Sequence, residues 1–319
     1  MSLFDENSSF PPDEQSSKES PAEPEPGASQ PPEDPSNLPL AGDPISLAAA
    51  LPAQAFSNSH KPALPEDLRI PWSWLHLLLF LFFGFFSLIL IQGGFAIYYT
   101  PLRHFSNEMD FERFVLSKPA FAIGSMVLWY AFLFLFLYVT LAVLRGLPFW
   151  RTLGWRKLTS RDAGWLRSPW LYLLGGLALS LLVSAVASRT QPSKDLPIEE
   201  LFRYKSTALL FMAMAVLVAP LVEETVFRGY LYPLLAKSFG VATSVIVTGV
   251  LFGLMHGAQL GWTWSLVSIL IGVGIIFTLA RACTGTVLAS FLLHLGYNST
   301  IALFTILATH GFTKFPSVH

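Results

Sequence analysis

The sequence predicts an all-α, polytopic transmembrane helical bundle of seven to eight helices with a disordered N-terminal tail. Three observations lead to this prediction. Of the 319 residues, 53% are hydrophobic and only 13% are charged, about half the charged fraction of a soluble domain. Long apolar runs recur from residue 72 onward, without strand-like alternation. The residues before them are acidic and rich in proline.

The predicted tail comprises residues 1–67. It holds twelve Asp or Glu, two Lys and 13 of the chain's 23 prolines. Such a segment buries too little apolar surface to offset the entropy lost on ordering. We therefore expect a disordered, acidic, cytoplasmic tail. It is either a solvated linker or a docking arm for a basic partner, whose identity the sequence leaves unknown.

The apolar runs define the predicted helices. A helix needs roughly 20 residues to cross the hydrocarbon core of a bilayer. The first three runs and the last are long enough, and we expect the shorter runs to pack inside the bundle. The fourth can continue past two glutamates to Leu235, giving one longer helix. The runs lie at about 72–99, 119–144, 169–188, 208–222, 241–256, 264–281 and 284–309.

The loop 145–168 sets the predicted orientation. It carries six Arg or Lys against one acidic residue, Asp162. The positive-inside rule therefore places this loop, and with it the N-terminus, on the cytoplasmic side. The expected location is a bacterial cell membrane, which the chain crosses several times. The predicted domains are the tail, N-terminal transmembrane helices at 68–195, and a C-terminal core at 196–319.

Two isolated residues have simple interpretations. Cys283 is the single cysteine, which excludes an internal disulfide and any cysteine-based zinc site. We expect it to pack as a small buried residue, as free cysteines usually do. His76 stands near the start of the first span and is expected at the membrane interface.

Two adjacent carboxylates, Glu223 and Glu224, lie inside an apolar segment with Arg228 one turn further on. Carboxylates are so costly in hydrocarbon that they indicate a functional site by default. Glu224 and Arg228 are four residues apart, so they share a helix face and can form an ion pair. Glu223 lies about 100° around the helix and can point into the bundle. The alternative is a buried network of all three with a purely structural role.

Two further apolar segments carry histidine. His256 ends one run, between Gly253 and Gly257, which permit close helix approach. His294 and Asn298 are four residues apart in the last run and face the same direction. Each could simply bridge helices by hydrogen bonding. Taken together with the glutamates they suggest a hydrolase, in which a carboxylate activates water and neighbouring polar groups stabilise the developing charge.

The three motifs, in this order, resemble those of the CAAX-protease and bacteriocin-processing family, also called CPBP or Abi. The resemblance covers about residues 205–309 and rests on Glu-Glu-x-x-x-Arg, Phe-x-x-x-His and His-x-x-x-Asn. It implies an intramembrane endopeptidase similar to the CAAX prenyl endopeptidases. It also implies a membrane-associated or lipid-tethered peptide or protein as substrate, within the lipid bilayer and without nucleic acid. The motif residues are Glu223, Glu224, Arg228, Phe252, His256, His294 and Asn298.

The resemblance also implies a role for each motif residue. Glu223 is the expected general base, His256 a second group that orients water, and His294 with Asn298 the oxyanion-stabilising pair. Glu224 and Arg228 are expected to support the glutamate helix. No cofactor is expected, although a catalytic zinc with three protein ligands and one open position stays open. Its ligands would be Glu223, His256 and His294.

Simple spans raise a conflict of depth, because they place Glu223 and His256 at opposite membrane faces. We favour a glutamate helix that extends to about Leu235 with Lys237 as its anchor, which brings Glu223 to mid-depth. The cavity is expected to open toward the cytoplasmic side or laterally to lipid. Two other functions remain open. One is a non-catalytic scaffold or immunity protein, and the other is a proton-coupled transporter, although no related halves are present.

Overall fold

A computed structural model describes residues 65–99, 114, 118–158, 167–189, 202 and 204–312. These residues belong to one unit, Pro62–His319. The predicted disordered tail lies outside the described residues, apart from its last three. Two of those three, Glu66 and Asp67, belong to a short 3-10 helix, η2 (Glu66–Leu68).

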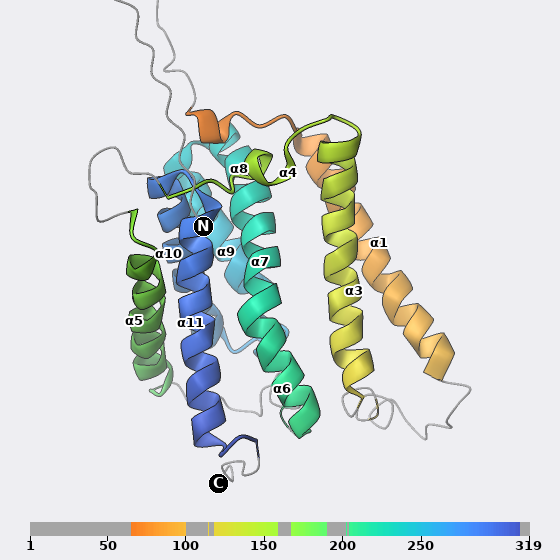
Figure 1. The fold of residues 1–319 in the computed structure, drawn as a ribbon, viewed down its shortest axis with the longest axis vertical. Helices are drawn as coiled ribbons and strands as arrows, with labels where there is room; N and C mark the ends of the chain where they lie inside the picture. Colours follow the sequence, from red (N-terminus) through yellow and green to blue (C-terminus); the bar gives the residue numbers. More distant parts are fainter. Residues whose placement is uncertain are drawn as a thin grey trace, which may run out of the picture. The chain divides into compact units, whose positions relative to one another are not determined.

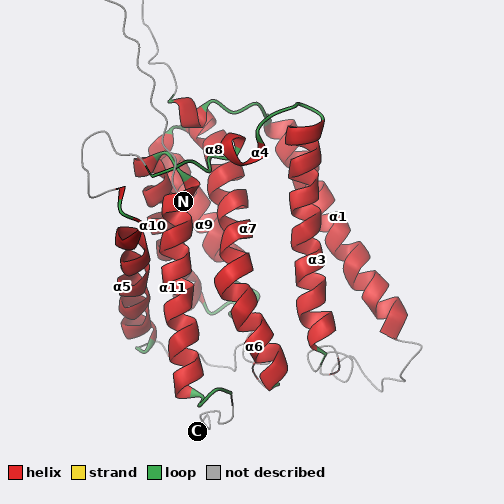
Figure 2. Ribbon diagram, in the orientation of Figure 1, coloured by secondary structure: helices red, strands yellow, loops and turns green. Residues whose placement is uncertain are grey.

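Helices account for all the regular structure that the described residues form (Figure 2). Six of these helices are long and apolar enough to cross a membrane, and a seventh apolar helix, α9, is shorter. The predicted all-α polytopic bundle is therefore confirmed, and the protein is a multi-pass integral membrane protein. The helices outside the glutamate segment are α1 (Trp74–Tyr99), α3 (Pro119–Leu137) with a π-helical extension η4 (Tyr138–Val143), α4 (Phe149–Thr152), α5 (Pro169–Ala187), α9 (Val241–Met255), α10 (Trp264–Thr284) and α11 (Val287–Ala308).

The glutamate segment is a single helical run of 35 residues, 205–239. Its predicted continuation past the glutamates is therefore confirmed. Pro220 and Pro233 lack the N–H that would bond one turn back, and π-helical turns, which often occur at functional sites, stand before both. In order, the parts are α6 (Lys205–Ala213), η7 (Met214–Val218), α7 (Ala219–Glu224), η8 (Thr225–Leu231) and α8 (Tyr232–Phe239).

Close packing of α9 on α10 follows from glycine. A Cβ on Gly249 or Gly253 would meet the backbone of α10 at 2.6 Å, so only glycine allows the two helices to approach this closely. The prediction for Gly253 is confirmed. Gly257 instead lies against the Trp262 ring in the loop that follows α9, so its contact is with its own loop and not with another helix.

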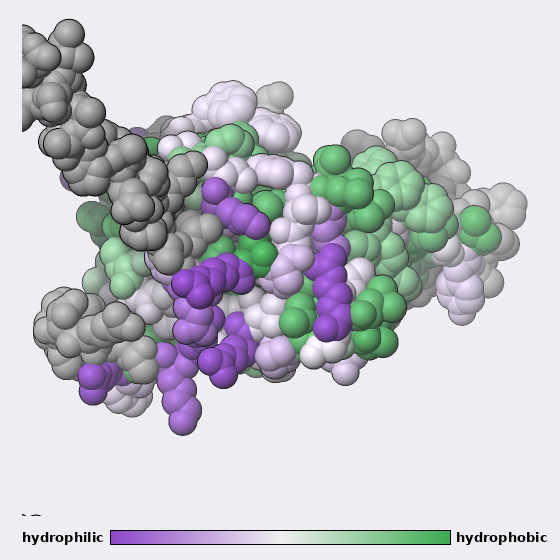
Figure 3. Space-filling view, turned by 90° about the horizontal axis from the view of Figure 1, so that it is seen from above, coloured by the Kyte–Doolittle hydropathy of each residue, from purple (hydrophilic) through white to green (hydrophobic). Residues whose placement is uncertain are grey.

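One end of the bundle is closed by η2 and by the segment 146–158, which contains α4 (Figure 1). Leu153 is fully buried there. Its carbonyl oxygen comes so close to η8 that a Cβ on Gly229 would lie 2.6 Å from it. Hydrophilic side chains gather on this face (Figure 3), and the exposed ion pair between Arg151 and Glu66 is among them. We call this end the capped end.

Hydrogen bonds hold the cap to the helices beneath it. The Trp155 indole N–H donates to Thr225 Oγ1 of η8 at 3.1 Å. The backbone N–H of Val287, the first residue of α11, donates to the Gly154 carbonyl at 2.9 Å. Arg281 Nη1 pairs with Asp67 Oδ2 at 2.8 Å, and the Arg281 side chain is fully buried. The end of the predicted tail is therefore part of the folded core.

Candidate active site

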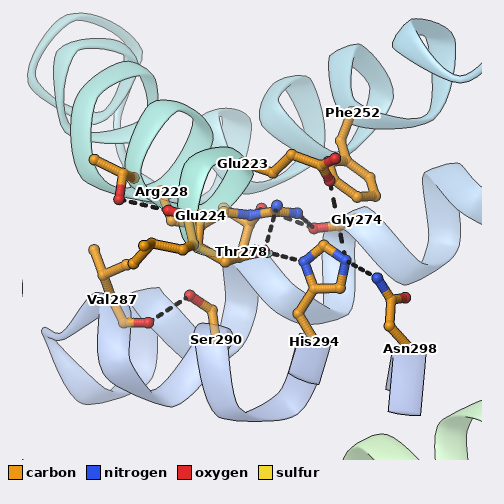
Figure 4. Close-up of polar contacts among 12 residues, drawn as sticks. Glu223, Glu224, Arg228, Phe252, Gly274, Thr278, Val287, Ser290, His294 and Asn298 are labelled. Atoms are coloured by element: carbon orange, nitrogen blue, oxygen red, sulfur yellow. Dashed lines mark hydrogen bonds and ion pairs between the residues drawn. The ribbon is translucent and has the colours of Figure 1, made fainter. Parts of the chain in front are cut away.

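Glu224 and Arg228 form the ion pair that their spacing allows. Arg228 Nη1 lies 2.9 Å from Glu224 Oε1, and both side chains are fully buried. The other guanidinium nitrogens donate to α10, Nη2 to the Gly274 carbonyl at 2.9 Å and Nε to Thr278 Oγ1 at 3.2 Å (Figure 4). The Phe252 ring lies 4.5 Å from the guanidinium carbon. Arg228 therefore joins the glutamate helix to α9 and α10.

His294 and Asn298 of α11 join the same network. Asn298 Nδ2 lies 2.7 Å from the Ala215 carbonyl and 3.2 Å from His294 Nε2. Since a carbonyl oxygen only accepts, this amide atom is the NH₂ group, and His294 Nε2 accepts its second hydrogen. Nδ1 of His294 then carries the ring proton and donates to Glu224 Oε1 at 2.9 Å.

Glu223 has a different environment from its neighbour. Its side chain keeps 14% of its surface exposed, and Oε2 lies 4.0 Å from His294 Nε2, beyond hydrogen-bond length. It lines a cavity of about 400 Å³ that His256, His294 and Asn298 also line. The four predicted catalytic residues, from three separate segments, therefore share one cavity.

His256 follows α9 directly. Its Nδ1 lies 2.8 Å from the Phe252 carbonyl, which can only accept, so Nδ1 carries the proton. In the neutral ring Nε2 is then left as an acceptor. In the Phe-x-x-x-His motif, the histidine therefore lies one helical turn after the phenylalanine, where its ring N–H can donate to the phenylalanine carbonyl.

The depth conflict is resolved by the lengths of two helices. Glu223 lies about 24 Å from the capped end of its helix, at 1.5 Å per residue. Helix α9 starts at that same end and is only 15 residues long, so His256 lies about 22 Å from it. The long glutamate helix and the short α9 together bring both residues to one depth.

The cavity extends away from the capped end. Its lining includes Phe202, next to the start of α6, and Thr305, near the end of α11. Gln259, in the loop after α9, is exposed and also lines it. The expected opening on the side of the basic loop is therefore not found, because Leu153 and its neighbours fill that end.

The predicted alternative of a zinc site concerns three of these cavity residues. Within the described ranges, no three His, Cys, Asp or Glu side chains are grouped so that they could hold a metal ion. Glu223, His256 and His294 thus share the cavity without the spacing of a three-ligand site. Metal dependence stays a prediction to be tested in solution.

The prediction for Cys283 is wrong, because this residue is exposed on the outer face of the last turn of α10. The interfacial depth expected for His76 stays a prediction. Its side chain is buried by protein, 7% exposed, and its Nδ1 lies 2.6 Å from the Tyr230 hydroxyl. Its position near the start of an apolar run could not reveal that the π-helical segment η8 would pack against it.

Fold and site together define a multi-pass membrane protein with a largely apolar cavity between its helices, into which Glu223, His256, His294 and Asn298 bring polar groups. Residues 205–300, less than a third of the chain, match the family described as Type II CAAX prenyl endopeptidase Rce1-like. This part of the chain is therefore similar to the Rce1-like family, in agreement with the resemblance that its motifs predicted. It lies within the segment 196–319 predicted as the core, while the exact domain boundaries stay predictions. No curated protein and no solved structure matches the chain.

Proposed function

We propose that this protein is an intramembrane endopeptidase that hydrolyses a peptide bond with a water molecule activated by Glu223. The observation that carries the proposal is the contrast between the two glutamates. The carboxylate of Glu224 accepts from Arg228 and His294. The carboxylate of Glu223 faces the cavity and accepts no hydrogen bond from any described residue, so it is free to take a proton.

The geometry suggests how water would be held. Glu223 Oε2 and His256 Nε2 are acceptors without a hydrogen-bond donor among the described residues, and both residues line the cavity, so a water molecule between them would give one hydrogen to each. Its oxygen would then attack the scissile carbonyl while Glu223 takes the proton. The C–N bond breaks when the proton passes on to the leaving amine. His294 Nε2 already accepts from Asn298, so His294 would stand 4.0 Å from Glu223 Oε2 without binding this water through that nitrogen.

The walls of the cavity support an extended substrate with apolar side chains. Met126, Phe211, Met212, Leu270 and Ile301 line it. A peptide segment at the membrane, or one held there by a lipid, has the right character. We propose such a peptide as substrate, with no nucleic-acid partner and no cofactor.

A cleavage assay tests the function. Purified protein in lipid vesicles is given fluorogenic peptides with a CAAX terminus, with and without a prenyl group. Glu223→Gln should abolish cleavage. Glu66→Gln is the matched control, since it makes the same chemical change at an exposed carboxylate on the capped end. If the parent cleaves no peptide in the panel, the non-catalytic scaffold is favoured. Loss of activity with a chelator, and its recovery with zinc, would show metal dependence.

The direction of the cavity makes a second proposal testable. Helix α1 begins at the capped end, whereas the cavity leads toward the opposite end of the bundle, where its opening, the mouth, lies. The N-terminus and the mouth therefore cannot both be cytoplasmic. We propose that the N-terminus is cytoplasmic and that substrate enters from the opposite side of the membrane.

Impermeant thiol labelling of sealed vesicles tests this orientation. In a Cys283→Ala background, Arg151→Cys should be labelled only from the cytoplasmic side and Gln259→Cys only from the other side. Labelling of both positions from one side would contradict the placement of the mouth. The reverse pattern would support a mouth opposite the capped end but would show that the protein has the opposite orientation in the membrane.

A further inference from the structure

Stabilising an oxyanion requires a hydrogen-bond donor aimed into the cavity, and the motif residues provide none in this structure. The N–H of His294 donates to Glu224, and the amide hydrogens of Asn298 go to Ala215 and to His294. The ring N–H of His256 donates to the carbonyl of Phe252. Every side-chain N–H of His256, His294 and Asn298 therefore already has a protein acceptor. These three residues present mainly acceptor atoms to the cavity.

Other polar residues line the cavity, and most are unsuited to this task. The Thr305 hydroxyl donates to the Ile301 carbonyl of its own helix at 2.9 Å. Gln259 is exposed and lies in the loop after α9. Two tyrosines remain, Tyr130 on α3 and Tyr297 on α11, and for neither does the described part of the chain provide a hydrogen-bond partner for the hydroxyl.

Tyr130 is the tyrosine that packs with the turn of the glutamate helix before Glu223. It is buried, 8% exposed, in a cluster that includes Ala219 and Val222, which both precede Glu223 within one turn. Tyr130 and Glu223 line the same cavity. Tyr297 belongs instead to a cluster with Phe277 and Leu293, among α5, α10 and α11.

We propose that the Tyr130 hydroxyl donates a hydrogen bond to the oxyanion that forms when the Glu223-activated water adds to the scissile carbonyl. This inference rests on the proposed peptidase function. The phenol keeps its proton throughout, so the proton taken from water still passes through Glu223 to the leaving amine. Through Tyr130, helix α3 would contribute a catalytic residue, although it lies outside the segment 205–300 that matches the Rce1-like family.

The test is Tyr130→Phe, with Tyr138→Phe as the matched control, since Tyr138 lies on the π-helical extension η4 of α3, is exposed and does not line the cavity. An oxyanion donor contributes about 10²- to 10³-fold to kcat, so Tyr130→Phe should lower kcat by roughly that factor. KM and the thermal unfolding temperature should stay within the range of the parent, because the ring that packs is retained. Tyr138→Phe should cleave like the parent.

A second measurement separates this inference from the proposed function. A peptide phosphinate mimics the tetrahedral oxyanion, and a reduced-amide peptide of the same sequence does not. Tyr130→Phe should weaken binding of the phosphinate by about the factor lost in kcat and leave the reduced-amide affinity unchanged. Full activity of Tyr130→Phe beside an inactive Glu223→Gln overturns the role of Tyr130 alone. A parent that neither cleaves peptides nor binds the phosphinate overturns the proposed function and this inference together.

Discussion

Two neighbouring regions of the glutamate helix differ sharply. Around Glu224, the carboxylate and its arginine are fully buried, and each also hydrogen-bonds to another helix, Arg228 to α10 and Glu224 to α11. Around Glu223, the carboxylate faces a cavity and is left without a hydrogen bond from the described residues. The comparison indicates that one glutamate holds helices together while the other is kept available for chemistry. The 100° that separates consecutive helix positions is enough to divide the roles.

The largest effect is expected at the cavity. Glu223→Gln removes the general base while preserving shape, and such a base contributes about 10²- to 10⁴-fold to the rate. We expect kcat to fall by this factor, with the thermal unfolding temperature unchanged. Peptide cleavage and unfolding in the same detergent check both statements. Wild-type kcat in Glu223→Gln would contradict the division of roles.

The opposite pattern is expected for Glu224→Ala. This change leaves the Arg228 guanidinium buried and unpaired, which costs about 3–5 kcal/mol of stability. The unfolding temperature should fall strongly, and activity should disappear with the fold. A Glu224→Ala protein that unfolds at the parent's temperature would show that the buried network does not hold the helices.

A smaller effect is expected at the capped end. In Gly229→Ala, the new methyl group would lie 2.6 Å from the carbonyl oxygen of Leu153, and such overpacking costs about 1–3 kcal/mol. Thermal unfolding checks this loss. Gly272→Ala is the matched control on α10, since nothing lies within 4 Å of its added Cβ, and it should leave the protein as stable or slightly more stable.

The smallest effect is expected on the exposed face of the cap. Arg151 and Glu66 lie 3.6 Å apart with most of both side chains in solvent, and exposed pairs of this kind contribute about 0–1 kcal/mol. Arg151→Ala should therefore leave the unfolding temperature close to that of the parent. A large fall in the unfolding temperature of Arg151→Ala would mean that surface charge holds the capped end closed, and not the packing of Leu153.

The features determined by the sequence itself are periodic or local along the chain. Apolar runs long enough to span a membrane identified the helices, since their length is set by the bilayer. Glu224 and Arg228 could be paired in advance because i, i+4 spacing places them on one helix face. The order of the three motifs identified the family of the segment 205–300.

The tertiary structure alone decided what depends on distant contacts. Tyr130 lies 93 positions before Glu223 in the sequence, and nothing in an apolar run marks the aromatic residue that will share a cavity with a carboxylate. The hydrogen bond between His76 and Tyr230 and the seal at Leu153 likewise join segments far apart in the chain. The cavity leads away from the capped end because Leu153 and its neighbours fill that end. Such contacts arise only when the helices pack, so local spacing cannot predict them.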